Sequence, residues 1–95
     1  MEKDIQSKII KFLKSQGAYV IKSIIANRSG VPDIIACYKG YFCGFEVKNE
    51  IAKPTPLQSY NIDSIIQAGG KALVVRSVED VSNVLDAINK CEFEY

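Results

Sequence analysis

The chain has 95 residues, a net charge of +1, no histidine and three cysteines that show no CxxC spacing. Its length favours one small domain over residues 1–95, and an apolar content of 47% argues against disorder. The absence of histidine excludes His/Cys zinc sites and Ser–His or Cys–His nucleophile pairs. The odd cysteine count, the lack of a visible signal peptide and the lack of a long apolar run predict an intracellular, cytoplasmic protein with no membrane span.

Charge is distributed unevenly along the chain. Residues 1–48 carry a net charge of +4, whereas residues 49–95 carry −3. This asymmetry fits a polyanion-binding face in the N-terminal half, and it fits ordinary solvated surface charge equally well.

The first expected element is a helix over residues 2–16. Ile5, Ile9 and Leu13 recur four residues apart, which is the spacing of a helix with one apolar face. Glu2 extends this series and therefore lies on the core-facing stripe. It is a favourable acid at a helix N-terminus, a frayed terminal residue, or a member of a functional site.

A β-hairpin is expected next. The β-branched run over residues 18–26 predicts a strand, and Pro32 is placed to open a second one. Residues 33–38 and 41–48 then read as two neighbouring strands, joined by Lys39-Gly40 as a two-residue turn.

That turn fixes the register of the hairpin. If Tyr38 pairs with Tyr41, Asp33 lies directly opposite Glu46, on the same face of the sheet. Lys48 lies one step further along that face. An odd-length loop would instead put the two acids on opposite faces.

Two opposed carboxylates are costly. With Cβ atoms about 5 Å apart, their repulsion is roughly 3 kcal/mol at an effective dielectric near 20. A divalent cation between Asp33 and Glu46, or a proton on one of them, would remove this cost. Oxygen ligands of this kind select Mg²⁺ or Mn²⁺. The alternative is an aspartate at the sheet edge and a surface Glu–Lys pair that meet no metal.

Gly44 is expected to leave the face open beside Ile35.

A second helix is expected to begin after a polar link and to run to Ala68. Thr55 is a good N-cap, Pro56 suits the first helical position, and Gln58 completes a capping box. The side chain of Gln58 either serves only as a cap or reaches the acid pair beneath the helix N-terminus.

The remainder predicts a strand over residues 71–75 and a final helix that Ser77 caps, followed by a tail over residues 91–95. The element order is α-β-β-β-α-β-α, which indicates an α/β domain with a mixed sheet flanked by helices.

These residues resemble the signature of the PD-(D/E)XK nuclease superfamily, and the chain is most similar to the small stand-alone VRR-NUC domains of viral and phage origin. The resemblance covers nearly the whole chain. It rests on four features: Gly30-x-Pro32-Asp33, Glu46-x-Lys48, Glu2 on the first helix, and Thr55-x-x-Gln58.

The resemblance implies a restriction-endonuclease-like core, with the last helix as an addition. It also implies an endonuclease that hydrolyses DNA phosphodiester bonds with Mg²⁺ or Mn²⁺, acting as a homodimer on branched DNA such as four-way (Holliday) junctions. If the protein is viral, it would act in the host cytoplasm.

The implied catalytic residues are Asp33, Glu46, Lys48, Glu2 and Gln58. Asp33, Glu46 and the backbone carbonyl of Val47 would hold the cation, with Glu2 completing the shell directly or through water. Candidate phosphate contacts are Lys22, Arg28 and Lys53, although each of these fits a solvated surface side chain as well.

Two alternatives remain at this point. One is a DNA-binding module with weak catalysis, or a nuclease subunit that needs a partner; it predicts salt-dependent DNA binding without turnover. The other is a purely structural α/β domain, which would neither bind DNA nor gain stability from a metal.

Overall fold

A computed structural model describes residues 2–92 of the chain. Seven elements follow one another: α1 (Glu2–Ser15), β1 (Tyr19–Lys22), β2 (Ile34–Tyr38), β3 (Tyr41–Val47), α2 (Pro56–Gln67), β4 (Lys71–Val75) and α3 (Val78–Glu92). This order confirms the predicted α/β fold with its additional C-terminal helix. Of the tail expected over residues 91–95, the first two residues belong to α3 and residues 93–95 lie outside the described part. No helix within residues 2–92 is long and apolar enough to cross a membrane.

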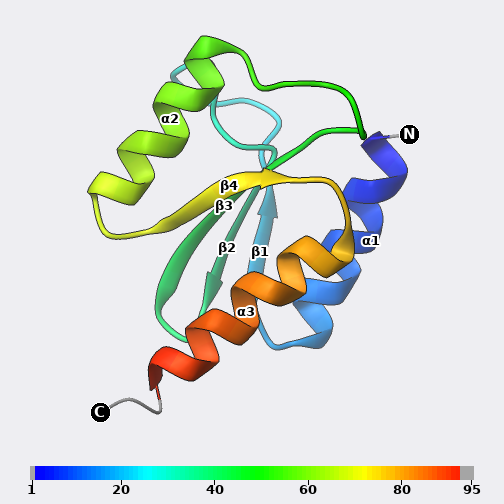
Figure 1. The fold of residues 1–95 in the computed structure, drawn as a ribbon, viewed down its shortest axis with the longest axis vertical. Coiled ribbons are helices and arrows are strands. Elements are labelled where there is room, and N and C mark those ends of the chain that lie inside the picture. The colour runs from blue at the N-terminus through cyan, green and yellow to red at the C-terminus, as the bar shows by residue number, and fades with distance from the viewer. Residues whose placement is uncertain (1, 93–95) are drawn as a thin grey trace.

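The sheet is mixed, as the sequence predicts, with strand order β1-β2-β3-β4. β1, β2 and β3 are antiparallel neighbours, and β4 runs parallel to β3 because α2 carries the chain across between them. Figure 1 shows α2 on one side of the sheet, with α1 and α3 on the other. The two faces of the sheet therefore pack against different helices.

The core lies between the sheet and the pair α1 and α3. Alternate residues of β2 and β3 point to this face because side chains in a strand alternate. The buried cluster contains Ile34, Ala36, Tyr38, Cys43, Phe45 and Val47 from these strands, and Ile9, Leu13, Val81, Leu85 and Ile88 from the two helices. The opposite face of β3 is thereby directed toward α2, and it carries Gly44 and Glu46.

The turn at residues 39–40 is confirmed. Tyr38 pairs with Tyr41, and both turn residues have positive φ, 50° for Lys39 and 86° for Gly40. Positive φ at both central positions is what a tight hairpin requires. Lys39 Nζ donates a hydrogen bond to Asn89 Oδ1 at 2.7 Å, which ties the turn to α3.

The first strand is shorter than the residues 18–26 predicted for it. β1 ends at Lys22, and one further bond joins Ser23 N to the carbonyl of Asp33 at 2.8 Å. Because Ser23 and Asp33 are a hydrogen-bonded pair, the next pair, Ile24 and Pro32, would exchange no backbone bond in this register. The ladder stops there, and Ile24 and Ile25 remain exposed in a loop.

The expectation that Gly44 leaves an open face is wrong. A Cβ atom built on Gly44 would lie 3.0 Å from Ile65 Cδ1 of α2 and 3.0 Å from Pro32 Cγ. Both side chains therefore occupy the space above the glycine. Gly44 allows α2 to approach the sheet closely, and it does not open a cavity beside Ile35.

Candidate active site

The hairpin places Asp33 beside Glu46. The last ladder pair of β2 and β3 is Ile34 with Phe45, so Asp33 and Glu46 occupy the next position of the register. Asp33 Oδ2 accepts a hydrogen bond of 2.9 Å from the backbone N–H of Val47, which fixes its carboxylate against the end of β3. The register computed from the turn is therefore confirmed.

Glu46 is buried, with 2% of its surface exposed, and its two oxygens have different surroundings. Oε2 accepts a hydrogen bond of 3.1 Å from Gln58 Nε2 and lies 3.7 Å from Lys48 Nζ. Oε1 is also buried but has no hydrogen-bond partner among residues 2–92. An unpartnered buried carboxylate oxygen is unfavourable, and a bound cation or a proton would satisfy it.

The surroundings raise the pKa of Glu46 from 4.5 to about 7. Burial is the largest cause because it disfavours the charged form, and the negative charge of Asp33 acts in the same direction. The ammonium group of Lys48 opposes them only in part. The pair thus carries more negative charge than its protein neighbours neutralise.

Gln58 caps the helix and also reaches the acid pair, so the interpretation in which it serves only as a cap is wrong. Its backbone N–H donates to Thr55 Oγ1 at 3.2 Å, and its Oε1 accepts from the Thr55 N–H at 2.9 Å, which completes the capping box. The remaining side-chain group, Nε2, donates to Glu46. One amide therefore fixes the start of α2 and joins it to the acid pair.

Replacing Gln58 with alanine is expected to cost about 1–2 kcal/mol of stability, because the cap and the bond to Glu46 are both lost. Cleavage of DNA should fall about tenfold or more. Thr55→Ala is the matched control, since it removes the other half of the capping box without touching Glu46. Thermal unfolding and initial cleavage rates separate the two variants. Equal losses of activity would show that Gln58 acts only as a cap.

Glu2 lies apart from the pair. Its Oε2 accepts a hydrogen bond of 3.3 Å from the backbone N–H of Asn49, in the link that follows β3. Across residues 2–92, no three His, Cys, Asp or Glu side chains lie close enough together to hold a metal ion. A role for Glu2, directly or through water, remains a prediction.

The predicted phosphate contacts are exposed side chains near this edge of the sheet. Lys22 ends β1, and Lys53 lies in the link before α2. Arg28 lies in the loop before β2, where it shares a hollow of about 430 Å³ with Asp33. Of the three, Arg28 shares a hollow with a member of the acid pair, and the roles of all three stay predictions.

Two residues that hold the site together were not singled out from the sequence. Arg76 Nη1 donates to the carbonyls of Asn49 and Ala52, the latter at 2.8 Å, and so anchors the link after β3. Asn61 Nδ2 donates to the carbonyls of Ser29 and Leu57, at 3.0 and 2.9 Å. A signal existed for Asn61, because it lies three residues after Gln58 on the same face of α2. The sequence gives none for Arg76.

A hard divalent cation fits the acid pair. Asp33 and Glu46 supply carboxylate oxygens, and the unpartnered Oε1 of Glu46 is the atom that such an ion would satisfy. Mg²⁺ commonly binds through one or two carboxylates and retains several waters, so a third protein carboxylate is not required.

The comparisons with known proteins agree with this geometry. A family described as archaeal Holliday junction resolvase (Hjc) matches residues 3–91. No curated protein sequence is significantly similar to the chain. A solved VRR_NUC domain is 27% identical, with a TM-score of 0.76 that covers 99% of this chain and 97% of that one.

Two further structures share the fold at lower identity. A VRR_NUC domain protein has a TM-score of 0.74 and 21% identity, over 90% of this chain and 85% of its own. The 1.6 Å structure of Archaeoglobus fulgidus Hjc, a Holliday junction resolvase from an archaeal hyperthermophile, has a TM-score of 0.55 and 21% identity, over 79% and 67%. With the family match over nearly its whole length, this chain belongs to the archaeal Holliday junction resolvase (Hjc) family, within the nuclease superfamily that its motif predicts.

Proposed function

We propose that this protein is a Mg²⁺- or Mn²⁺-dependent endonuclease that cleaves branched DNA, with four-way junctions as its preferred substrate. The observation that carries the proposal is the buried Glu46, with one oxygen unpartnered and the other held by Gln58 and Lys48, beside Asp33. Membership of a resolvase family supports the choice of DNA substrate.

Each residue of the site has a distinct task in this proposal. Asp33, Glu46 and the carbonyl of Val47 would hold the cation, and Glu2 would act directly or through a water. When bound, a divalent ion polarises the scissile phosphate and lowers the pKa of a bound water. Lys48 directs its ammonium group toward the charge that develops on the phosphate.

The order of the side chains suits phosphodiester hydrolysis. Lys48 Nζ lies 3.7 Å from Glu46 Oε2, so its ammonium group is held beside the acid pair. Gln58 Nε2 donates a hydrogen bond to the same oxygen. Oε2 is therefore held by the protein, whereas Oε1 has no partner among the described residues. The site is therefore organised before substrate arrives, which is a requirement for efficient electrostatic catalysis.

DNA binding is proposed to involve Lys22, Arg28 and Lys53 as phosphate contacts, all exposed near the catalytic edge.

We also propose that two copies act together, because a single domain of 95 residues presents only a small basic face to a branched substrate. Residues 1–95 would form one nuclease domain in each copy. The structural likeness to a VRR_NUC domain supports a nuclease domain. From the sequence resemblance alone, we propose that it is a stand-alone nuclease of viral or phage type that acts in the cytoplasm.

A panel of labelled DNA substrates tests the proposal. Linear, nicked, flap, forked and four-way substrates are incubated with the protein in Mg²⁺, Mn²⁺ or EDTA. Cleavage is expected on the branched forms with either ion and on none of them in EDTA. Salt-dependent binding without cleavage in any divalent ion would contradict the proposal and would favour a DNA-binding module that needs a partner.

Replacing Lys48 with alanine is expected to lower the single-turnover cleavage rate by about 10²–10³, because one electrostatic stabiliser of the transition state is lost. DNA affinity should change far less. Lys14→Ala is the matched control, since Lys14 is an exposed lysine on α1, away from the acid pair. A Lys48→Ala enzyme with a wild-type rate would remove this residue from the mechanism.

A further inference from the structure

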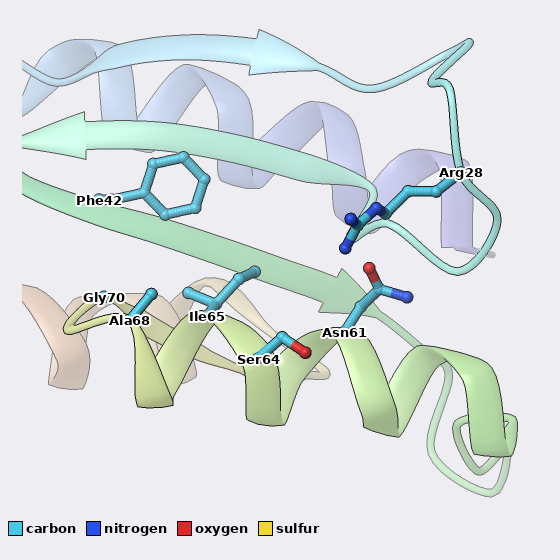
Figure 2. Close-up of a pocket in the computed structure, with 7 residues that line it drawn as sticks. All are labelled: Arg28, Phe42, Asn61, Ser64, Ile65, Ala68 and Gly70. Carbon is cyan, nitrogen blue, oxygen red and sulfur yellow. The ribbon is translucent and has the colours of Figure 1, made fainter.

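A second cavity lies on the same face of the sheet as the acid pair. Its volume is about 400 Å³, and seven residues line it: Arg28, Phe42, Asn61, Ser64, Ile65, Ala68 and Gly70. Figure 2 shows it between α2 and the sheet, with Phe42 at one end and the guanidinium group of Arg28 at the other. This size lies in the range of about 300–1,000 Å³ typical of small-molecule sites.

Asn61 supplies a fixed hydrogen-bond acceptor to this cavity. The side chain is 95% buried, and its Nδ2 donates to the carbonyls of Ser29 and Leu57. With Nδ2 bonded to these carbonyls, the amide oxygen is directed away from them. Its Oδ1 consequently faces the cavity below Arg28 and accepts no hydrogen bond from the described residues (Figure 2). Because this oxygen is open to the cavity, it can accept a hydrogen bond from a ligand that brings an N–H or O–H donor.

Phe42 and Arg28 add the two other groups that a nucleotide requires. The ring of Phe42 remains 46% exposed on a face that α2 covers only in part. Such a ring offers a surface on which a base can stack. Arg28 is the one charged residue among the described side chains of the lining, and it forms no ion pair or hydrogen bond within residues 2–92. Its guanidinium group suits a phosphate oxygen.

The cavity lies within reach of the same DNA strand as the acid pair. Phe42 and Glu46 both belong to β3 and share one face, four residues or about 13 Å apart. Ile65 and Pro32 fill the surface between them, over Gly44. A strand whose phosphodiester bond lies at Asp33 and Glu46 would therefore cross this ridge and present a nearby nucleotide to the cavity.

We propose that this cavity binds a single unpaired nucleobase next to the scissile phosphate, stacked on Phe42, with its N–H donor on Asn61 Oδ1 and its phosphate on Arg28. Every DNA base carries an N–H donor on its Watson–Crick edge, and in a duplex that donor is already paired. The cavity therefore selects unpaired bases while tolerating any of the four. The inference rests on the proposed nuclease function and supplies a physical basis for the choice of branched DNA.

Fluorescence and affinity measurements on a forked DNA test this proposal. The unpaired nucleotides at the branch are replaced one at a time by 2-aminopurine, and a fully paired duplex of the same length is the reference. All binding is measured in EDTA, so that no cleavage occurs. Wild-type protein is expected to bind the fork at least tenfold more tightly than the duplex and to quench 2-aminopurine at one particular position.

Two substitutions of Phe42 distinguish stacking on an aromatic ring from simple filling of the cavity by an apolar side chain. Phe42→Leu should lower the preference for the fork about tenfold and abolish the quenching, whereas Phe42→Tyr keeps both, because it retains the stacking surface. Tyr60→Leu, which removes an exposed ring of α2 outside the lining, should change neither. Arg28→Ala should weaken binding to both DNAs and reduce the salt dependence by about one phosphate contact.

The outcomes distinguish the cavity from the nuclease site. Quenching that is equal at all unpaired positions, or a preference that survives Phe42→Leu, overturns the base-binding inference even if the protein cleaves branched DNA in Mg²⁺. Position-specific quenching by a protein that does not cleave branched DNA in Mg²⁺ would support the base-binding cavity and contradict the proposed endonuclease activity. A protein that binds neither DNA contradicts both.

Discussion

Replacing Glu46 with glutamine is expected to stabilise the metal-free protein while abolishing its nuclease activity. Glutamine has nearly the same size and keeps an oxygen for Gln58, but it carries no charge beside Asp33. The raised pKa of Glu46, about 7 against 4.5, corresponds to a cost of roughly 3 kcal/mol for keeping the carboxylate ionised in the fold. Removal of that charge should recover a large part of this free energy at pH 8.

The raised pKa of Glu46 also predicts the direction in which the free energy of unfolding changes with pH. Between pH 4.5 and 7 the folded protein holds a proton on Glu46 that the unfolded chain has released. The free energy of unfolding is therefore highest below pH 4.5 on this account, falls as the pH rises to about 7, and is level above it. Glu46→Gln lacks this fall.

Urea unfolding in EDTA at pH 5 and pH 8 measures the difference between wild type and Glu46→Gln. Glu50→Gln is the matched control, because Glu50 is exposed in the link after β3. Single-turnover cleavage in Mg²⁺ should be undetectable for Glu46→Gln and normal for the control. A Glu46→Gln protein that is less stable than wild type at pH 8 would show that the carboxylate is satisfied by its protein neighbours.

Replacing Gly30 with alanine is expected to cost about 3 kcal/mol of stability. Gly30 has φ +81°, and a Cβ atom there would lie 2.8 Å from the carbonyl oxygen of Leu57 and 2.9 Å from Asn61 Nδ2. The carbonyl belongs to the backbone of α2 and cannot retreat without moving the helix. Backbone strain of about 1–2 kcal/mol adds to this clash. Since α2 carries Gln58, cleavage should fall as well.

Gly69→Ala is the matched control for Gly30→Ala. Gly69 also has a positive φ, +99°, but a Cβ atom built there meets nothing within 4 Å. It should cost only about 1 kcal/mol, the usual penalty for a side chain in this conformation. Chemical denaturation of both variants measures the two losses. Equal losses would mean that α2 moves freely away from the loop at Gly30.

The hairpin could be predicted in detail from the sequence because a two-residue turn leaves no freedom in the register. Once Tyr38 paired with Tyr41, the period of two along each strand placed Asp33 opposite Glu46. The capping box of α2 was predictable for a similar reason, since its partners are three residues apart.

Features that depend on packing between distant segments could not be predicted in this way. β1 ends at Lys22 although the β-branched run continues to Ile25, because the length of a strand depends on its pairing with β2 and not on the run itself. The space over Gly44 is filled by Ile65 from α2. The bonds of Arg76 and Asn61 go to carbonyls of irregular segments, whose positions no local pattern specifies.

The central claim is that Asp33 and Glu46 together hold the divalent ion on which cleavage depends. An anomalous difference map from crystals of the wild-type protein soaked in Mn²⁺ tests it most directly. We expect a peak bonded to a carboxylate oxygen of each residue, including Oε1 of Glu46, and no peak in Glu46→Gln crystals soaked in the same way. A map with no peak between these carboxylates, or with the same peak in the Glu46→Gln crystals, would contradict it.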